Sequence, residues 1–274
     1  MDNIENLEKA KERINKMAED FKGDKTLKPI LRDFLMNLEE VIQKKDPSNY
    51  LLLPQNKDHS DLLVTLTRLA YGSEVQTIAE ELKLRLGNND QGFIGDITFE
   101  KAKKLCLGLD GFMTTPSYFV EKLKLLNSGK AFDGAGRNLS SSKANQALND
   151  ITELRNPWRA EWLNHKYSQK DSGIFVTYTK FVNGKLELVT EHLDEDTLME
   201  DKTPGISLDD WVNNPTSQGL PRKDVKKGSL YFWKPRENSV AGFGAGAGWV
   251  GLYCFWDHAG SYSALGVRLI REKK

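Results

Sequence analysis

The clearest chemical pattern in this chain is a set of glycines and aromatic residues between Ser239 and Arg268. The glycines at the centre of this stretch are Gly242, Gly244, Gly246, Gly248 and Gly251. Its aromatic residues are Phe243, Trp249, Tyr253, Phe255, Trp256 and Tyr262. Each glycine disfavours a helix by roughly 1 kcal/mol relative to alanine, so short strands and loops are expected. Aromatic rings displayed on such a scaffold favour the binding of a ligand.

The glycines lack the surroundings of a phosphate-binding loop. A dinucleotide site needs a strand before the loop, a helix after it and an acidic residue about 20 positions further on. Here an aromatic strand is expected after the glycines, which argues against a nucleotide. Cys254 and His258 could form a thiol nucleophile with its base. The favoured interpretation places Cys254 in the core as a small apolar residue.

Metal-ligating patterns are weak in this sequence. The histidines have no ligand spacing with cysteine or with each other; they are His59, His165, His192 and His258. The acidic segment 194–201 lacks the glycine and the final glutamate of an EF-hand loop, so a solvated loop is favoured over a calcium site. The sequence therefore predicts no catalytic residue, no metal and no cofactor.

Composition limits the classes to which the chain can belong. Its 274 residues include 39 basic and 39 acidic side chains, so the net charge is zero and nucleic acid is not an expected partner. The two cysteines are far apart and do not indicate a disulfide framework. No apolar run approaches the about 20 residues of a membrane span, and no signal-peptide pattern is found. The chain is expected to be cytoplasmic as synthesised, with surface display left open.

Helical periodicity dominates the first part of the chain. Thr115 and Pro116 mark one helix start and Gly129 its end, as an N-cap, a first-turn proline and a C-terminal glycine. Ser60 and Thr98 are interpreted as caps of two others. The expected helices span 2–21, 27–43, 61–71, 74–86, 98–109, 115–129, 143–154 and 158–167. The first two are amphipathic and favour a helical hairpin over a coiled coil with a partner.

After residue 170 the periodicity becomes that of strands. Asn183-Gly184 separates two runs of β-branched and aromatic residues across 174–190, which predicts a hairpin with a two-residue turn. Ser207 begins a short helix, and further strands are expected at 229–233 and 264–270. Helices followed by strands indicate an α+β fold. The expected division is a helical region over 1–111 and a second domain over 112–274.

Several short motifs occur together in the second domain. They are Ser239-Val240-Ala241, Gly251-Leu252, Cys254, Trp256, Ser261 and Leu265-Gly266-Val267-Arg268, with Asn156 to Leu163 and Gln218 to Pro221 upstream. With these motifs, residues 112–274 resemble the variable proteins of diversity-generating retroelements. The resemblance implies a C-type-lectin-like fold of the formylglycine-generating-enzyme type, with a small antiparallel sheet. It also implies a variable region at about 233–268, where a reverse transcriptase misincorporates opposite template adenines.

The resemblance separates variable positions from a fixed frame. Variable positions hold residue types that an asparagine codon reaches by changing only its adenines, and alternate positions of an extended chain share one face. The ligand-binding positions expected on this basis are Gly244, Gly246, Gly248, Tyr253, Phe255, Asp257, Gly260 and Tyr262, with Trp233, Arg236, Trp249 and His258 as additional candidates. The frame expected to face the core comprises Phe243, Ala245, Leu252, Cys254, Trp256, Leu265 and Val267.

The implied function is binding of a macromolecule, with a protein favoured, by an interchangeable face on a rigid frame. Tyr253 and Phe255 would supply stiff contact area, so replacing both by alanine is expected to abolish binding with little change in melting temperature. The chain is not expected to be an enzyme. Two alternatives stay open. One is an enzyme of the formylglycine-generating-like fold, which needs suitably paired cysteines, and the other is an adaptor that docks partners through its N-terminal helices.

Overall fold

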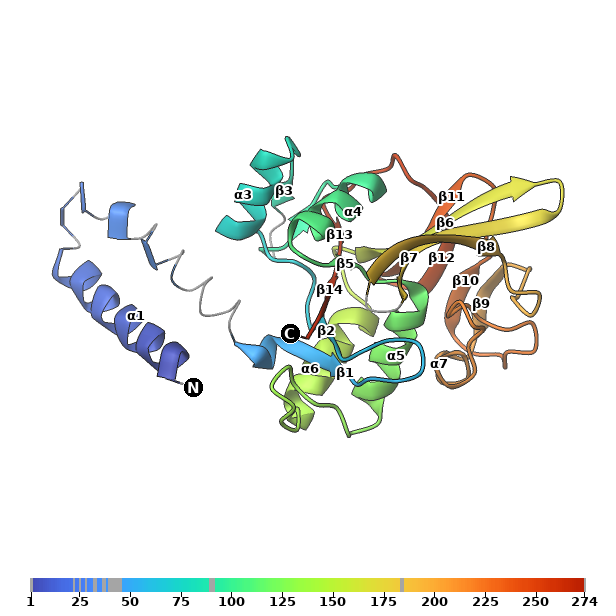
Figure 1. Ribbon diagram of the computed structural model, residues 1–274, viewed down its shortest axis with the longest axis horizontal. Helices are drawn as coiled ribbons and strands as arrows, with labels where there is room; N and C mark the ends of the chain where they lie inside the picture. The colour runs from blue at the N-terminus through green and yellow to red at the C-terminus, as the bar shows by residue number, and fades with distance from the viewer. Residues whose placement is uncertain are drawn as a thin grey trace.

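The computed structural model describes residues 2–21, 23–24, 26–27, 29–31, 34–35, 38, 46–88, 92–182 and 185–273. The chain begins with the amphipathic helix α1 (Asp2–Asp20), as predicted. The predicted helix over 27–43, and with it the helical hairpin or coiled coil, lies largely outside the described residues. From η1 (Pro47–Asn49) onward the chain builds sheets with helices packed on them (Figure 1).

Four strands form a small antiparallel sheet in the order β1-β2-β14-β5. They are β1 (Tyr50–Leu53), β2 (Leu62–Thr65), β14 (Leu269–Glu272) and β5 (Phe112–Met113). Strand β2 shows that the predicted helix over 61–71 is wrong. Its side chains alternate between buried and half-buried, and Val64 pairs with Ile270 near the end of the chain. Ser60 therefore precedes a strand, and its hydroxyl donates a hydrogen bond to Glu272.

Besides α1, four of the predicted helices are confirmed. They are α3 (Ser73–Glu81), α4 (Phe99–Gly108), α5 (Pro116–Asn127) and α6 (Ser141–Thr152), of which α3 ends earlier than predicted. Thr115 caps α5 by accepting a hydrogen bond from the Tyr118 amide, and Gly129 follows the helix with a φ of +66°. A left-handed glycine after a helix satisfies its last carbonyl groups at no steric cost. Between α3 and α4, β3 (Gly87–Asn88) pairs with β4 (Ile94–Gly95).

The larger sheet has eight strands, seven of them in the order β8-β7-β6-β11-β12-β10-β9, with β13 paired to β6. Its neighbours are antiparallel except for the β10–β12 and β13–β6 pairs. The strands are β6 (Arg159–Lys170), β7 (Gly173–Val182), β8 (Lys185–His192), β9 (Lys202–Ile206), β10 (Leu230–Trp233), β11 (Ser239–Ala245), β12 (Val250–Asp257) and β13 (Leu265–Gly266). Helix α7 (Leu208–Asn213) is capped by Ser207 as predicted. The fold is α+β with largely antiparallel sheets.

Strand β6 shows that the predicted helix over 158–167 is also wrong. It lies between β7 and β11, with Trp162 opposite Gly242. Trp158 and Trp162 share one face of a helix at four-residue spacing, but they share one face of a strand equally well. The hairpin predicted across 174–190 is confirmed by β7 and β8, which project from the body in Figure 1. Its turn residues, 183 and 184, lie outside the described residues.

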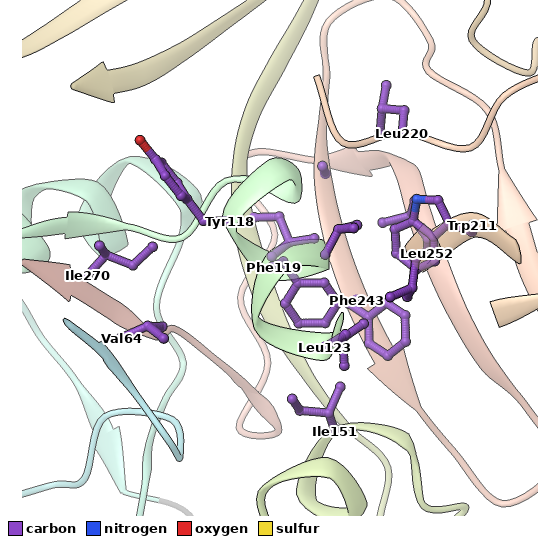
Figure 2. Packing of buried hydrophobic residues seen from close by; sticks show 14 of the residues in the cluster. Val64, Tyr118, Phe119, Leu123, Ile151, Trp211, Leu220, Phe243, Leu252 and Ile270 are labelled. Carbon is purple, nitrogen blue, oxygen red and sulfur yellow. The ribbon is translucent and has the colours of Figure 1, made fainter. Parts of the chain in front are cut away.

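Two apolar cores pack on opposite faces of the larger sheet. In the first, Phe119 of α5 lies 4.9 Å from Phe243 of β11 between ring centroids, and Leu252 lies nearby (Figure 2). The second core lies under α4 and includes Trp162 of β6 and Val240 of β11. Each core draws residues from both sides of the expected boundary at 111/112. Packing is thus continuous across that boundary.

Candidate functional site

Aromatic rings form a continuous cluster on the face of the larger sheet opposite Phe243. The Tyr253 ring of β12 lies between two indoles. Its centroid is 4.2 Å from that of Trp233, with 11° between the planes, and 4.6 Å from that of Trp256, with 22°. Trp256 in turn meets Trp162 of β6 edge to face at 5.5 Å. Such pairs add to the stability gained by burying the rings. The rings come from β6, β10 and β12, so three strands hold this cluster in place.

A β-bulge brings Tyr253 and Trp256 to the same face although they are three residues apart. Strand β11 pairs Gly242 with Tyr253 and Val240 with Trp256, so β12 carries one extra residue between these two pairs. Gly242 is needed at this position, because an added Cβ would lie 2.2 Å from the Trp256 ring. Strict alternation would place Trp256 in the first core with Leu252. Instead, Trp256 is half-buried at the aromatic cluster, so its assignment to the frame is wrong.

A pocket of about 480 Å³ opens beside this cluster, which is within the usual size of small-molecule sites. Six aromatic side chains line it: Trp158, Trp162, Trp249, Tyr253, Trp256 and Tyr262. The other lining residues are Asn156, Gly246, Ala247, Asp257, Gly260 and Leu265. Trp249 meets Tyr253 at 80°, and Trp158 meets Tyr262 at 66°. The two rings of each pair therefore touch at a steep angle, and Tyr262, 58% exposed, reaches solvent.

The structure brings five of the eight predicted variable positions to this pocket. They are Gly246, Tyr253, Asp257, Gly260 and Tyr262. Of the other three, Gly248 is exposed between β11 and β12, Gly244 is buried in β11, and Phe255 contacts Trp233 at 6.0 Å outside the lining.

The additional candidates occupy different places. Trp249 lines the pocket and Trp233 stacks on Tyr253. The Arg236 guanidinium lies 4.9 Å above the Phe255 ring. The backbone carbonyl of His258 accepts a hydrogen bond from the amide of Phe99, the first residue of α4. Only the two tryptophans of this group belong to the aromatic cluster.

The sequence predicts that Gly244 and Gly246 face solvent, and the structure shows that this is wrong. Both are buried. A Cβ added to Gly246 would lie 2.7 Å from the Trp249 indole, and one added to Gly244 would lie 3.0 Å from the Ala160 Cβ. At Gly248, by contrast, nothing lies within 4 Å of an added Cβ. These glycines leave space for Trp249 to cover the end of β11.

We therefore expect asparagine at Gly248 and at Gly246 to affect the free energy of unfolding very differently. Gly248→Asn should change the free energy of unfolding by less than about 0.5 kcal/mol, because the new side chain enters solvent. Gly246→Asn should cost about 1–3 kcal/mol, because it displaces the Trp249 indole. Urea unfolding of both variants measures the difference. Equal stability of the two would show that Trp249 does not constrain position 246.

Six lining residues were not predicted as binding residues; they are Asn156, Trp158, Trp162, Ala247, Trp256 and Leu265. The sequence assigns Trp256 and Leu265 to the frame. Trp158 and Trp162 were missed because the wrong helix over 158–167 made them look like core packing. A usable signal was present, because even spacing in a strand places Trp158 and Trp162 on one face together with Ala160. In the structure Trp162 is fully buried and donates a hydrogen bond to the Ile97 carbonyl, which fixes this wall of the pocket.

The expected frame residues are buried except for Trp256, but they are divided between the two faces of the sheet, because Leu265 and Val267 belong to the second core. Phe243, Leu252 and Cys254 are buried in the first core; Ala245, Leu265 and Val267 are also buried. Burial raises the pKa of the Cys254 thiol to about 12, and it raises the pKa of Cys106 above its ordinary range as well. Cys106 lies in the second core, on the other face of the sheet. Both sulfurs therefore behave as protonated, apolar groups.

A buried charge network lies behind the pocket. The Arg268 Nε donates to both Glu161 carboxylate oxygens at 2.8 and 2.9 Å, and its Nη2 donates to Asp150 at 2.8 Å. Arg159 binds the other Asp150 oxygen at 2.8 Å. Burial alone would raise the pKa of Asp150, but the charges of Arg268 and Arg159 outweigh it and hold that pKa below its ordinary value. The network ties α6 to β6 and the C-terminal segment.

Known patterns define the site no further. Among the described residues, no three His, Cys, Asp or Glu side chains lie close enough together to hold a metal ion. None of the helices in the described ranges is both long and apolar enough to cross a membrane. Comparison of the chain with family models, curated proteins and solved structures gives no match.

Proposed function

We propose that this chain is a diversified ligand-binding protein, similar to the variable proteins of retroelements, in which a C-type-lectin-like domain presents the aromatic pocket. One observation carries the proposal. Five positions chosen from the sequence as variable line a single pocket; they are Gly246, Tyr253, Asp257, Gly260 and Tyr262. These positions were chosen by residue type and alternation alone, so their meeting at one concave site supports a shared role in binding. The role proposed is binding of a macromolecule, with a protein favoured, and not catalysis.

The construction of the sheet supports this role. The inner face of β12 is fixed by Leu252 and Cys254 in the core, whereas its outer face and the following loop carry Asp257 and Tyr262 toward solvent. Residues exposed on a rigid frame can change with small effects on stability. The buried thiols of Cys106 and Cys254, placed on opposite faces of the sheet, count against the alternative of an enzyme that uses paired cysteines.

The decisive genetic test is the DNA around the coding sequence. We expect a near-copy of the segment encoding about residues 233–268, differing only at adenines and lying beside a reverse-transcriptase gene. A neighbourhood without such a repeat would remove the diversification part of the proposal. Ligand binding by the pocket would then need its own evidence.

A protein-level test compares two small libraries. Randomising Gly248, Asp257 and Tyr262 should leave most members folded, since each change at such sites shifts stability by about ±0.5 kcal/mol or less. Randomising Phe243, Leu252 and Cys254, which are buried, should leave few members folded. Sorting displayed libraries by protease resistance counts the survivors. Similar survival in both libraries would contradict the division into a variable face and a frame.

A further inference from the structure

The pocket lining carries negative charge and no positive charge. Of its twelve lining residues, all within the described ranges, Asp257 is the one with a carboxylate, and none is lysine, arginine or histidine. Asp257 is exposed, and its Oδ1 accepts a hydrogen bond from the Ala259 amide at 2.9 Å. An anionic ligand would meet this carboxylate with no basic lining residue to offset it. The electrostatics favour a cation.

The walls favour the same charge. The face of an aromatic ring is the negative end of its quadrupole, so a cation placed over several faces is attracted by each. Trp158, Trp249, Trp256 and Tyr262 contribute rings to the lining. Tyr253 supports them from beneath, because Trp233 and Trp256 cover its two faces and Trp249 touches it edge to face with 5.4 Å between centroids. A lining so rich in aromatic rings is typical of sites that hold alkylated ammonium groups.

The shortage of hydrogen-bond acceptors distinguishes between cations. A primary ammonium brings three N–H donors and a guanidinium brings five, and each buried donor without an acceptor costs free energy. The lining offers few polar side chains, essentially Asn156 and Asp257 with the tyrosine hydroxyls. A quaternary ammonium has no donor to satisfy. Resting on the proposed binding role of this pocket, we propose that it binds a quaternary ammonium group, carried either by a free choline-type molecule or by a trimethyl-lysine side chain.

The first test measures choline binding to the full chain by calorimetry and by tryptophan fluorescence. The matched control is 3,3-dimethyl-1-butanol, which has the same shape without the charge. We expect saturable choline binding at least about tenfold tighter than that of the neutral alcohol, the preference expected for a desolvated cation over ring faces. Equal affinities, or no choline binding, would overturn the proposal.

Variants assign the effect to the pocket. Trp249→Leu keeps an apolar group but removes a ring, and should lower choline affinity about tenfold or more. Asp257→Asn keeps the Oδ1 acceptor but removes the charge, and should lower choline affinity about fivefold while leaving the neutral alcohol unchanged. Phe132→Leu changes an exposed ring outside the lining and should have no effect. Melting curves confirm that each variant is folded, and full choline affinity in both pocket variants would contradict the assignment.

Two further arms identify the source of the cation. A peptide containing trimethyl-lysine is compared with the same peptide containing unmodified lysine. Binding of choline alone assigns the site to free small molecules, whereas preference for the methylated peptide assigns it to protein ligands. The outcomes also separate this inference from the proposed function. One outcome is that no cation binds while the template repeat is found and the library at Gly248, Asp257 and Tyr262 stays folded. That outcome would remove the ligand class and leave the diversified binding role standing.

Discussion

Replacing Arg268 with methionine should lower the free energy of unfolding by about 3–5 kcal/mol, the cost of removing one partner from a buried ion network. Arg268 is 1% exposed and donates to Glu161, Asp150 and the Leu66 carbonyl. Methionine fills much of the same volume, so the loss comes from the carboxylates. Glu161, buried in β6, would be left without its counter-charge. Urea unfolding monitored by tryptophan fluorescence measures the loss.

A surface arginine provides the matched control. Arg236 pairs with Asp201 at 2.7 Å, but its side chain is 49% exposed. Arg236→Met should therefore cost no more than about 1 kcal/mol. In addition, Arg268→Met combined with Glu161→Gln should be more stable than the sum of the two single losses predicts, because the second change removes the uncompensated charge. Equal effects of the two arginine variants would show that the buried network does not stabilise the fold.

Local chemistry explains which elements were predictable from the sequence. Thr115 and Pro116 start α5 through contacts within one turn, and the β7–β8 hairpin depends on neighbouring residues of the same segment. The two segments wrongly predicted as helices pair with neighbouring strands, β1 and β7, and also with remote ones. Val64 of β2 pairs with Ile270, and Trp162 of β6 pairs with Gly242. The remote pairs cannot be seen in the segments themselves, and the spacing of their apolar residues fits a helix as well as a strand.

The candidate site was predictable to a similar degree. Alternation along β12 correctly separates Leu252 and Cys254, which are buried in the first core, from Tyr253 on the other face. It fails at Trp256, because the bulge opposite Ala241 adds a residue and returns that side chain to the face of Tyr253. Bulges depend on the pairing of two strands and cannot be seen in one of them. The walls from Trp158 and Trp162 were missed for the reason that β6 was missed.

Burial also changes the meaning of the expected variable set. The sequence distinguishes residues that face away from the core from those that face into it, but it does not show which outward residues are covered by others. Gly246 lies under Trp249, and Tyr253 lies between Trp233 and Trp256. Outward-facing positions therefore divide into a covered layer, which supports the pocket, and a rim that includes Asp257 and Tyr262. The rim is where substitution should be tolerated.

Tyr253 provides the sharpest test of this division. The sequence alone predicts that alanine at 253 and 255 leaves the melting temperature almost unchanged. Tyr253 is only 7% exposed and stacks on two indoles, so we now expect Tyr253→Ala to cost about 3 kcal/mol, as in other large aromatic deletions. For a chain of this size that loss corresponds to a fall in melting temperature of roughly 6–12 °C. Scanning calorimetry measures it.

Two companion variants make this result specific. Tyr253→Phe keeps the stacked ring and should lose much less stability than Tyr253→Ala. Phe255→Ala removes a half-buried ring outside the pocket lining and should also lose less. A melting temperature of Tyr253→Ala within about 2 °C of the parent would contradict the covered layer. If the expected fall is found, lost binding in Tyr253→Ala reports a collapsed wall, and only rim variants such as Tyr262→Ala can report lost contact with a ligand.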